Sequence, residues 1–84
     1  MSIKMYFVYI LKSLIVLRYY IGSSENVARR LSDHNSGKVK STKAYKPWEV
    51  VYTERFDTKS DAIKREKQIK SYKSGNAFKK LLSL

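Results

Sequence analysis

The chain has 84 residues, no cysteine and a single histidine, His34. This composition excludes disulfides, thiolate zinc sites and His-rich metal sites. Lys and Arg number 18 against 7 Asp and Glu, which gives a formal net charge of +11. On so small a surface this charge attracts polyanions, with nucleic acid as the first candidate partner and an anionic membrane surface as the second. The length predicts one domain over residues 1–84.

The first twenty residues are apolar, but they do not fit a signal peptide. Lys12 interrupts the run, tyrosines crowd it, and no small-residue cleavage site follows. The uninterrupted apolar stretches are also far shorter than the roughly 20 residues of a membrane-spanning helix. We therefore expect a cytoplasmic protein that does not act at a membrane.

Residues 5–21 predict a β-hairpin. Both halves are rich in Tyr, Val, Ile and Phe, residue types that favour strands over helices. The first strand is expected over residues 5–12. Its consecutive apolar positions, residues 6–11, indicate a central strand that is covered on both faces. The second strand is expected over residues 17–21. Gly22 then lets the backbone turn sharply or approach another group closely.

The reversal of this hairpin decides which side chains face each other. If the chain reverses near Leu14 and Ile15, Tyr9 lies directly opposite Tyr20. Two neighbouring phenols can be plain packing, or they can form a hydroxyl pair prepared for phosphate chemistry. The tip, residues 14–17, is Leu-Ile-Val-Leu and lacks the usual turn residues, so it is either exposed or in contact with a partner.

A helix is predicted after this hairpin, capped by Ser23 or Ser24, with Glu25 in its first turn and Gly37 as its stop. The cap residues satisfy backbone N–H groups that the helix itself leaves unpaired.

At helical spacing, Val27, Leu31 and His34 form one stripe of this helix, with Arg30 at its edge and Arg29 on nearly the opposite side. We interpret Arg29 as a solvated surface charge. The side chain of Arg30 either lies along the edge of the core or reaches over the sheet to bind an anion.

Residues 38–46 form a polar connector that contains four lysines, namely Lys38, Lys40, Lys43 and Lys46. The connector is either an ordinary solvated loop or a loop that grips a phosphate backbone. Residues 48–56 are rich in strand-favouring types and predict a third strand. Charged residues interrupt this segment, so we expect it to be less buried than the first strand.

A second long helix is predicted over residues 57–72, with Asp57 or Thr58 as its cap, and a short C-terminal helix over residues 77–84. Together the elements predict an α+β fold. The expected architecture is a small three-stranded antiparallel sheet flanked by helices, in the order β-β-α-β-α-α.

Glu66 is the most informative acidic residue. On a helical wheel it shares the apolar face of the second helix with Ala62 and Ile69. An unpaired carboxylate is costly to bury, so Glu66 needs a salt-bridge partner, a proton or a metal ion. Arg30 is the candidate partner for a salt bridge.

Four motifs, in this order, resemble the GIY-YIG nuclease superfamily, and in particular its small single-domain bacterial members. They are Val8-Tyr9-Ile10, Tyr20-Ile21-Gly22, the segment 29–35 with Arg30 and His34, and Glu66 within REKQIK. The resemblance covers about residues 5–72, and the ordered set is far more specific than either tripeptide. The family fold is a small antiparallel three-stranded sheet flanked by helices, as the pattern analysis predicts.

The resemblance implies a divalent-metal-dependent endonuclease that hydrolyses phosphodiester bonds. It implies that Tyr9 or Tyr20 is the general base toward the attacking water and that Arg30 stabilises the transition-state phosphate. It also implies that Glu66 holds one Mg²⁺ or Mn²⁺ ion. His34 resembles a histidine that lies near the site in some branches of the family.

Ser23 stands where some repair nucleases of the family carry a lysine thought to help activate the tyrosine, so the route of proton removal stays open. The alternative function is a non-catalytic or weakly active nucleic-acid-binding module on the same scaffold, because no separate DNA-reading domain is evident. On either hypothesis the partner is nucleic acid, with DNA favoured over RNA. The oligomeric state stays open, with a monomer favoured.

Overall fold

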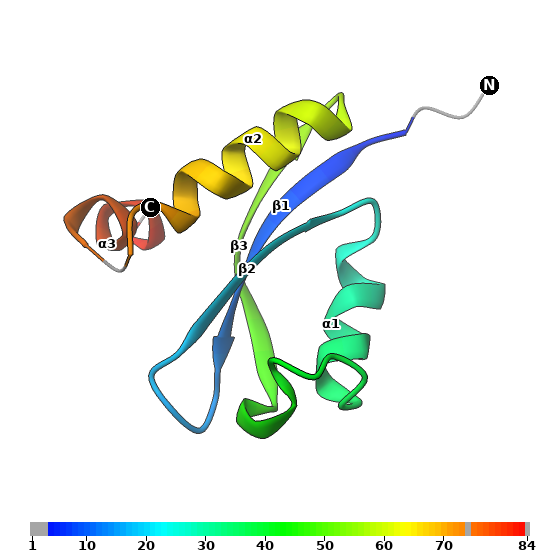
Figure 1. Ribbon diagram of the computed structural model, residues 1–84, viewed down its shortest axis with the longest axis vertical. Coiled ribbons are helices and arrows are strands. Elements are labelled where there is room, and N and C mark those ends of the chain that lie inside the picture. Colours follow the sequence, from blue (N-terminus) through cyan, green and yellow to red (C-terminus); the bar gives the residue numbers. More distant parts are fainter. Residues whose placement is uncertain (1–3, 74, 84) are drawn as a thin grey trace.

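The computed structural model describes residues 4–73 and 75–83 (Figure 1). Its strands are β1 (Tyr6–Ser13), β2 (Tyr19–Ser24) and β3 (Trp48–Phe56), and its helices are α1 (Val27–Asn35), α2 (Lys59–Lys70) and α3 (Asn76–Leu82), with a short 3₁₀ turn, η1 (Lys43–Tyr45). The strands form one antiparallel sheet. The predicted α+β class and the order β-β-α-β-α-α are confirmed.

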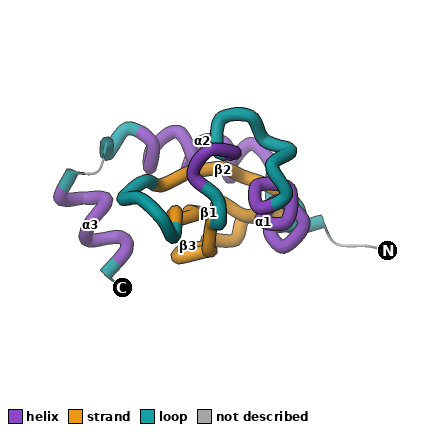
Figure 2. Tube along the Cα trace, turned by 90° about the horizontal axis from the view of Figure 1, so that it is seen from below, coloured by secondary structure: helices purple, strands orange, loops and turns teal. Residues whose placement is uncertain are grey.

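The sheet has the order β2-β1-β3, so β1 is central. Helix α1 lies on one face of the sheet, and α2 and α3 lie on the other (Figure 1); in Figure 2 the strands lie between α1 and α3. Successive side chains of a strand point to opposite faces. Val8 and Ile10 of β1 therefore pack toward α2 and α3, whereas Tyr9 and Leu11 pack on the α1 side. The expectation that this strand is covered on both faces is confirmed.

The predicted pairing of the two tyrosines is wrong by two residues. Tyr9 faces Gly22, and Tyr20 faces Leu11. The second strand accordingly lies further along the chain than residues 17–21. A shift of two residues leaves each side chain on its original face of the sheet, so both tyrosines still point to the same side.

Ser13 explains the register of the hairpin. Its backbone N–H donates to the carbonyl of Arg18 at 2.9 Å, which closes a loop between these two residues. Its hydroxyl also accepts hydrogen bonds from the N–H groups of Ile15 and Val16, at 3.2 and 3.3 Å. A serine that holds the backbone of the following residues replaces the missing Gly, Asn or Asp of an ordinary turn.

Helix α1 begins later than predicted. Its cap is Asn26, whose side-chain oxygen accepts from the N–H of Arg29 at 3.0 Å, and not Ser23 or Ser24. The two serines remain paired with β1 and extend the sheet instead. Glu25 therefore lies before the helix and not in its first turn.

The remaining elements follow the predictions closely. The third strand has the expected bounds, and Thr58 caps α2 by accepting from the N–H of Asp61 at 3.1 Å. Helix α2 ends at Lys70, two residues before the predicted end. Leu84, the last residue of the predicted terminal helix, lies outside the described residues. No helix in the described part of the chain is long and apolar enough to span a membrane.

Candidate active site

The two motif tyrosines lie side by side on the α1 face of the sheet. Their ring centroids are 6.2 Å apart, and Tyr9 is only 1% exposed. The phenol of Tyr9 extends across the backbone of Gly22, where an added Cβ would lie 2.7 Å from the Tyr9 hydroxyl oxygen. Gly22 therefore allows the close approach that its position suggested, because any side chain there would collide with Tyr9.

His34 is completely buried beside this pair. Its Nε2 atom lies 3.4 Å from the Tyr9 hydroxyl, and its Nδ1 atom lies 2.8 Å from the hydroxyl oxygen of Thr42. The Thr42 hydroxyl donates its hydrogen to the carbonyl of Val39 at 3.3 Å. Its oxygen is thus left to accept a hydrogen bond from Nδ1–H. This assignment places an unprotonated Nε2 in front of the Tyr9 hydroxyl.

The electrostatic environment keeps both groups neutral near pH 7. Burial raises the pKa of Tyr9; Arg30 opposes this effect, while Tyr20 and Glu66 add to it. Burial lowers the pKa of His34, and the positive charge of Arg30 lowers it further. A protonated phenol therefore faces a neutral imidazole, which is the correct pairing for a hydrogen bond from Tyr9 to His34.

Arg30 reaches from α1 to this cluster. Its guanidinium lies beside the Tyr9 hydroxyl, and hydrogen bonding there raises the pKa of Arg30. It also forms a salt bridge with Asp33 at 3.2 Å, and 32% of its side chain remains exposed. Arg30 is thus held near Tyr9 while part of it stays open to an incoming anion. Arg29 is exposed, as predicted.

Glu66 projects from α2, on the other side of the sheet, and meets the edge strand β2. The hydroxyl of Ser23 donates to one carboxylate oxygen at 2.6 Å, and the ammonium of Lys70 contacts the other at 2.6 Å. Its side chain is 18% exposed, so it lies at the margin of the apolar face and not in the middle of it. The salt-bridge partner is Lys70 and not Arg30, which pairs with Asp33 instead.

The donor atoms available to a metal ion are few. No group of three or more His, Asp or Glu residues in the described part of the chain could hold one. Mg²⁺ usually keeps several waters and binds through one or two carboxylates together with substrate phosphates. The Glu66 carboxylate offers at most one such ligand, and Ser23 and Lys70 already contact both of its oxygens. The described residues therefore form no all-protein metal centre.

The lysine-rich connector is anchored to the core although its lysines point outward. Thr42 is 2% exposed, and the indole N–H of Trp48 donates to its carbonyl at 3.0 Å. The hydroxyl of Ser13 donates to the carbonyl of Tyr45 at 2.6 Å. The four predicted lysines are all exposed; they are Lys38, Lys40, Lys43 and Lys46. They remain outside the tyrosine cluster, on a loop that also supplies the partner of His34.

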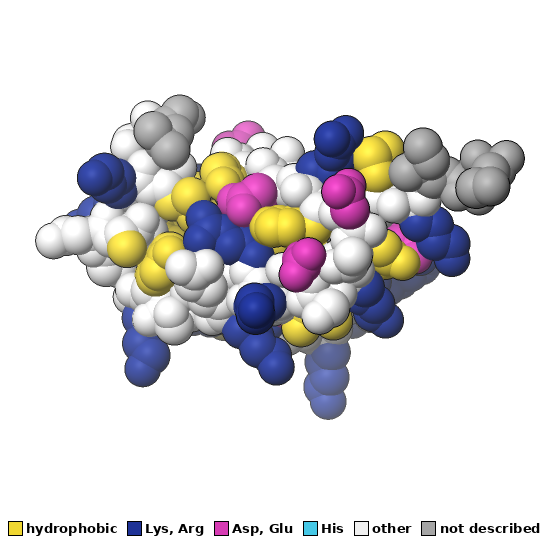
Figure 3. All heavy atoms as spheres, turned by 90° about the horizontal axis from the view of Figure 1, so that it is seen from above, with side chains coloured by type: hydrophobic (Ala, Val, Ile, Leu, Met, Phe, Trp, Pro, Cys, Tyr) yellow, Lys and Arg dark blue, Asp and Glu magenta, His cyan; other side chains and the backbone are white. Residues whose placement is uncertain are grey.

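The α2 side of the molecule carries both acidic and basic side chains (Figure 3). In Figure 3, which looks onto this side, acidic, basic and hydrophobic side chains lie next to one another in the middle of the face, and further Lys and Arg side chains project around it.

The sequence analysis missed two residues that complete the site. Lys70 follows Glu66 by four residues, a spacing at which oppositely charged side chains meet on a helix, so this pair was readable from the sequence. Thr42 carries no comparable local signal. Its role depends on a loop that folds back onto His34, eight residues earlier.

The comparisons with known proteins identify the family of the chain. The GIY-YIG catalytic domain model matches residues 5–79. The chain is 44% identical over 54 residues to a UPF0213 protein of Staphylococcus saprophyticus, covering 63% of this chain and 66% of that protein. It is 49% identical over 53 residues to a UPF0213 protein of Natronomonas pharaonis, covering 62% of each. The chain thus spans slightly less than two thirds of the length of these curated relatives.

A solved structure covers more of the chain. The solution NMR structure of a UPF0213 protein from Bacillus halodurans matches 94% of this chain and 83% of its own, with 32% identity and a TM-score of 0.59. The chain therefore belongs to the GIY-YIG catalytic domain family. The family is one of nuclease-type catalytic domains, whose members generally use a divalent metal.

Proposed function

We propose that the protein is a divalent-metal-dependent endonuclease that hydrolyses phosphodiester bonds, with DNA favoured over RNA and residues 1–84 acting as one nuclease domain. The observation that carries the proposal is the convergence of Tyr9, His34 and Arg30 on the α1 face. Glu66 is the residue that we assign to the metal ion, at the edge strand β2 beside Ser23.

Tyr9 is the group that we assign as general base. In the free protein it is protonated, since burial raises its pKa. The unprotonated Nε2 of His34 is positioned to accept the phenolic proton, and the positive charge of Arg30 favours the phenolate that results. The phenolate then takes a proton from the attacking water. Tyr20, which lies beside Tyr9, is the second candidate for this role.

Arg30 and Glu66 act on the phosphate. The exposed part of the guanidinium donates hydrogen bonds to the phosphate oxygens, where charge builds in the transition state. Glu66, steadied by Ser23, is the residue that would hold the metal ion. A bound divalent cation supplies Lewis acidity and charge neutralisation at the phosphate. The four lysines of the connector add sequence-independent contacts to the backbone of the nucleic acid.

A nuclease panel tests this proposal. Purified protein is incubated with duplex, single-stranded and branched DNA and with RNA, in Mg²⁺, in Mn²⁺ and in EDTA. We expect cleavage of at least one substrate in the presence of metal only. Glu66→Gln keeps the size of the side chain and removes its charge, so we expect it to bind nucleic acid and not to cleave it.

A nucleic-acid-binding module with weak or no turnover is the second candidate function. It is favoured by the partners of Glu66, because Ser23 and Lys70 already occupy both carboxylate oxygens, and by the raised pKa of Tyr9. Both functions predict binding that weakens steeply with salt. An absence of metal-dependent cleavage on every substrate of the panel, with binding intact, would establish the binding module instead.

A further inference from the structure

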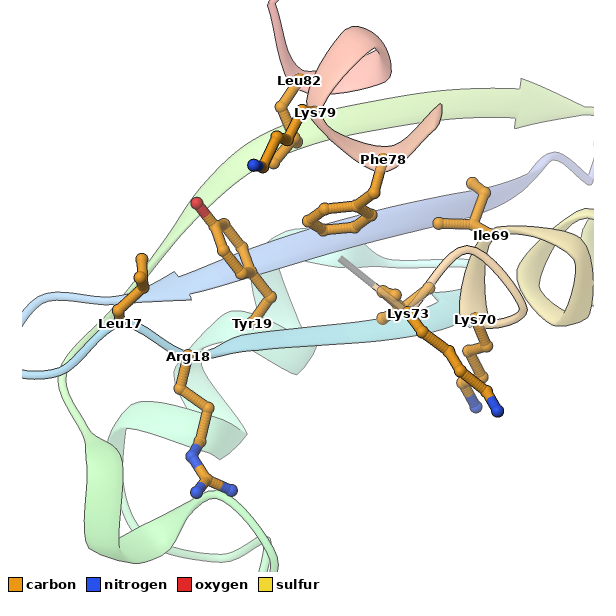
Figure 4. Close-up of a pocket in the computed structure, with 10 residues that line it drawn as sticks. Leu17, Arg18, Tyr19, Ile69, Lys70, Lys73, Phe78, Lys79 and Leu82 are labelled. Atoms are coloured by element: carbon orange, nitrogen blue, oxygen red, sulfur yellow. The ribbon is translucent and has the colours of Figure 1, made fainter. Parts of the chain in front are cut away.

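We propose that an apolar groove on the α2 and α3 side, together with the hairpin tip, docks an acidic amphipathic helix of a partner protein. The groove lies between β2, the end of α2 and α3, and has a volume of about 470 Å³ (Figure 4). This proposal goes beyond the nuclease function, because the groove is not lined by Tyr9, Tyr20, Arg30, His34 or Glu66; Lys70, which contacts Glu66, lies at its rim.

The floor of the groove is apolar. Its lining side chains Tyr19, Ile21 and Leu82 are half-buried and lie over the buried side chains of Ile69 and Phe78. Figure 4 shows Phe78 and Ile69 pointing into the space beside Tyr19. The rings of Tyr19 and Phe78 meet edge to face with centroids 5.1 Å apart, so the floor is packed and well defined.

The hairpin tip extends this apolar surface. Leu14, Ile15, Val16 and Leu17 are 56%, 59%, 44% and 84% exposed. Leu17 lines both the groove and the shallower hollow around the tip, so the two apolar regions are continuous. The hydrogen bonds of Ser13 hold this loop in a defined shape. A contiguous, ordered apolar patch on a small protein marks an interaction site.

The chemistry of the groove favours a helix over a nucleobase. Most of its apolar side chains are aliphatic. Phe78 is only 3% exposed, so the half-buried ring of Tyr19 is the one aromatic surface that the described lining offers to a base. Aliphatic grooves accept the apolar face of a helix, with anchor side chains at positions i, i+3 or i+4, and i+7.

The rim of the groove selects for acidic flanks. Its charged lining residues are Arg18, Lys70, Lys73 and Lys79, with no acidic residue among the described lining. Lys70 contacts Glu66, but no carboxylate in residues 4–73 and 75–83 lies within salt-bridge distance of Lys73 or Lys79. In Figure 4 the ammonium groups of Lys70 and Lys73 extend away from the apolar floor, where a helix lying in the groove would place its polar flank.

The same charges argue against a second copy of this chain as the occupant. Each copy carries a formal net charge of +11, and self-association through the groove would bring two basic rims together. Like charges placed opposite each other weaken an interface. A partner with acidic flanks turns this repulsion into attraction.

Selection from a displayed library of helical peptides tests the proposal. The library is selected on the wild-type protein alone, and Leu17→Glu is kept for the binding assays; this substitution is safe for the fold because Leu17 is 84% exposed. We expect enriched peptides with apolar residues at helical spacing and net negative charge. Leu17→Glu and the double variant Lys73→Glu/Lys79→Glu should each weaken their binding about tenfold or more, which corresponds to roughly 1.4 kcal/mol.

Two control variants isolate the groove. Val51→Glu places the same charge on an exposed apolar position of β3, and Lys64→Glu reverses an exposed charge on α2; neither residue lines the groove. Both controls should bind the selected peptides like the wild type. All four variants should keep the nuclease activity of the wild-type protein, so failure of the docking proposal and failure of the nuclease proposal give different results.

Other outcomes would overturn the proposal. A selection that yields no helical binder, or only binders that Leu17→Glu does not weaken, would remove the docking site. If no peptide binds and the wild type binds phosphatidylserine vesicles that Leu17→Glu does not bind, the surface is a lipid site. If the same holds for a single-stranded oligonucleotide, the surface is a nucleic-acid site. A wild-type dimer in sedimentation that Leu17→Glu dissociates would assign it to a second copy.

Discussion

The two faces of the sheet are built from different chemistry, although β1 supplies side chains to both. On the α2 and α3 side, Ile10 and Ile69 belong to a buried cluster of apolar residues. On the α1 side, Tyr9 packs beside the buried polar groups of His34 and Thr42. The first face holds the molecule together by apolar burial, whereas the second also buries hydroxyls and an imidazole.

This difference separates the apolar core from the candidate general base and its partners, whereas Glu66 projects from α2 at the edge strand β2. Buried polar groups cost free energy unless each has a hydrogen-bond partner. In the described part of the chain, every buried side-chain nitrogen and oxygen has one. On the α1 face the hydrogen bonds of Tyr9, His34 and Thr42 therefore satisfy the buried polar groups. Variants of the two faces should consequently fail in different ways.

The largest expected loss of stability lies on the apolar face. Ile69 is fully buried, so Ile69→Ala should lower the free energy of unfolding by about 2–5 kcal/mol. Urea unfolding measures this loss, and cleavage per folded molecule should not change. Ile63→Ala, on the same helix but only half-buried, is the matched control and should lose less. Lost cleavage in a stably folded Ile69→Ala protein would contradict the separation of the two faces.

Gly22→Ala should have the next largest effect, this time on the polar face. The new Cβ would lie 2.7 Å from the Tyr9 hydroxyl oxygen and 2.8 Å from the adjacent ring carbon. We expect a loss of about 1–3 kcal/mol in unfolding free energy from overpacking, together with loss of cleavage. In a Tyr9→Leu background the same substitution should cost much less stability. An equal cost in both backgrounds would show that Tyr9 is not the obstacle.

Thr42→Val tests the hydrogen bond that orients His34. The change leaves the buried Nδ1–H without a partner and should cost about 1 kcal/mol or somewhat more in stability. Cleavage should fall about tenfold with substrate affinity unchanged, and Thr42→Ser should restore it. Nitrogen chemical shifts of His34 report which ring nitrogen carries the hydrogen. If the tautomer in Thr42→Val is unchanged and cleavage is normal, Thr42 has no positioning role.

The smallest expected effect is the contribution of His34 to the pH dependence of stability. Burial lowers its pKa in the folded protein below the usual value of about 6.5. Between these two pKa values the unfolded chain binds more protons than the folded one. Its contribution to stability is therefore complete above pH 6.5 or so and declines as the pH falls toward the lowered value.

Thermal unfolding of the wild type and of His34→Gln, at pH 7.5 and pH 5.5, measures this contribution. The wild type should lose more stability on acidification than the variant does. An equally steep loss in both proteins would assign the effect to other groups.

Most of the fold follows from local patterns in the sequence. The bounds of β3 are as predicted because its residue types favour a strand and Pro47 and Asp57 flank it. The buried stripe of α1 follows from its helical spacing, which places His34 on the inner side. The register of the hairpin was not predictable in this way, because it depends on Ser13 acting as a turn residue.

The candidate site was only partly predictable for a related reason. Sequence motifs indicate Tyr9, Arg30 and Glu66, but not which contacts these side chains make. Arg30 pairs with Asp33, and Glu66 pairs with Lys70. Each of these salt bridges lies within one helix, and together they replace the expected long-range salt bridge between Arg30 and Glu66. The contact of Thr42 with His34 depends on the tertiary path of a lysine-rich loop, which no local pattern encodes.

Cleavage by Tyr9→Phe is the most direct test of the central claim that the polar face carries out hydrolysis. The variant removes one oxygen atom and leaves the buried ring in place. With Mg²⁺ present, it should bind the same labelled nucleic acid as tightly as the wild type and cleave it about 100-fold more slowly or worse. Cleavage at the wild-type rate would contradict the account.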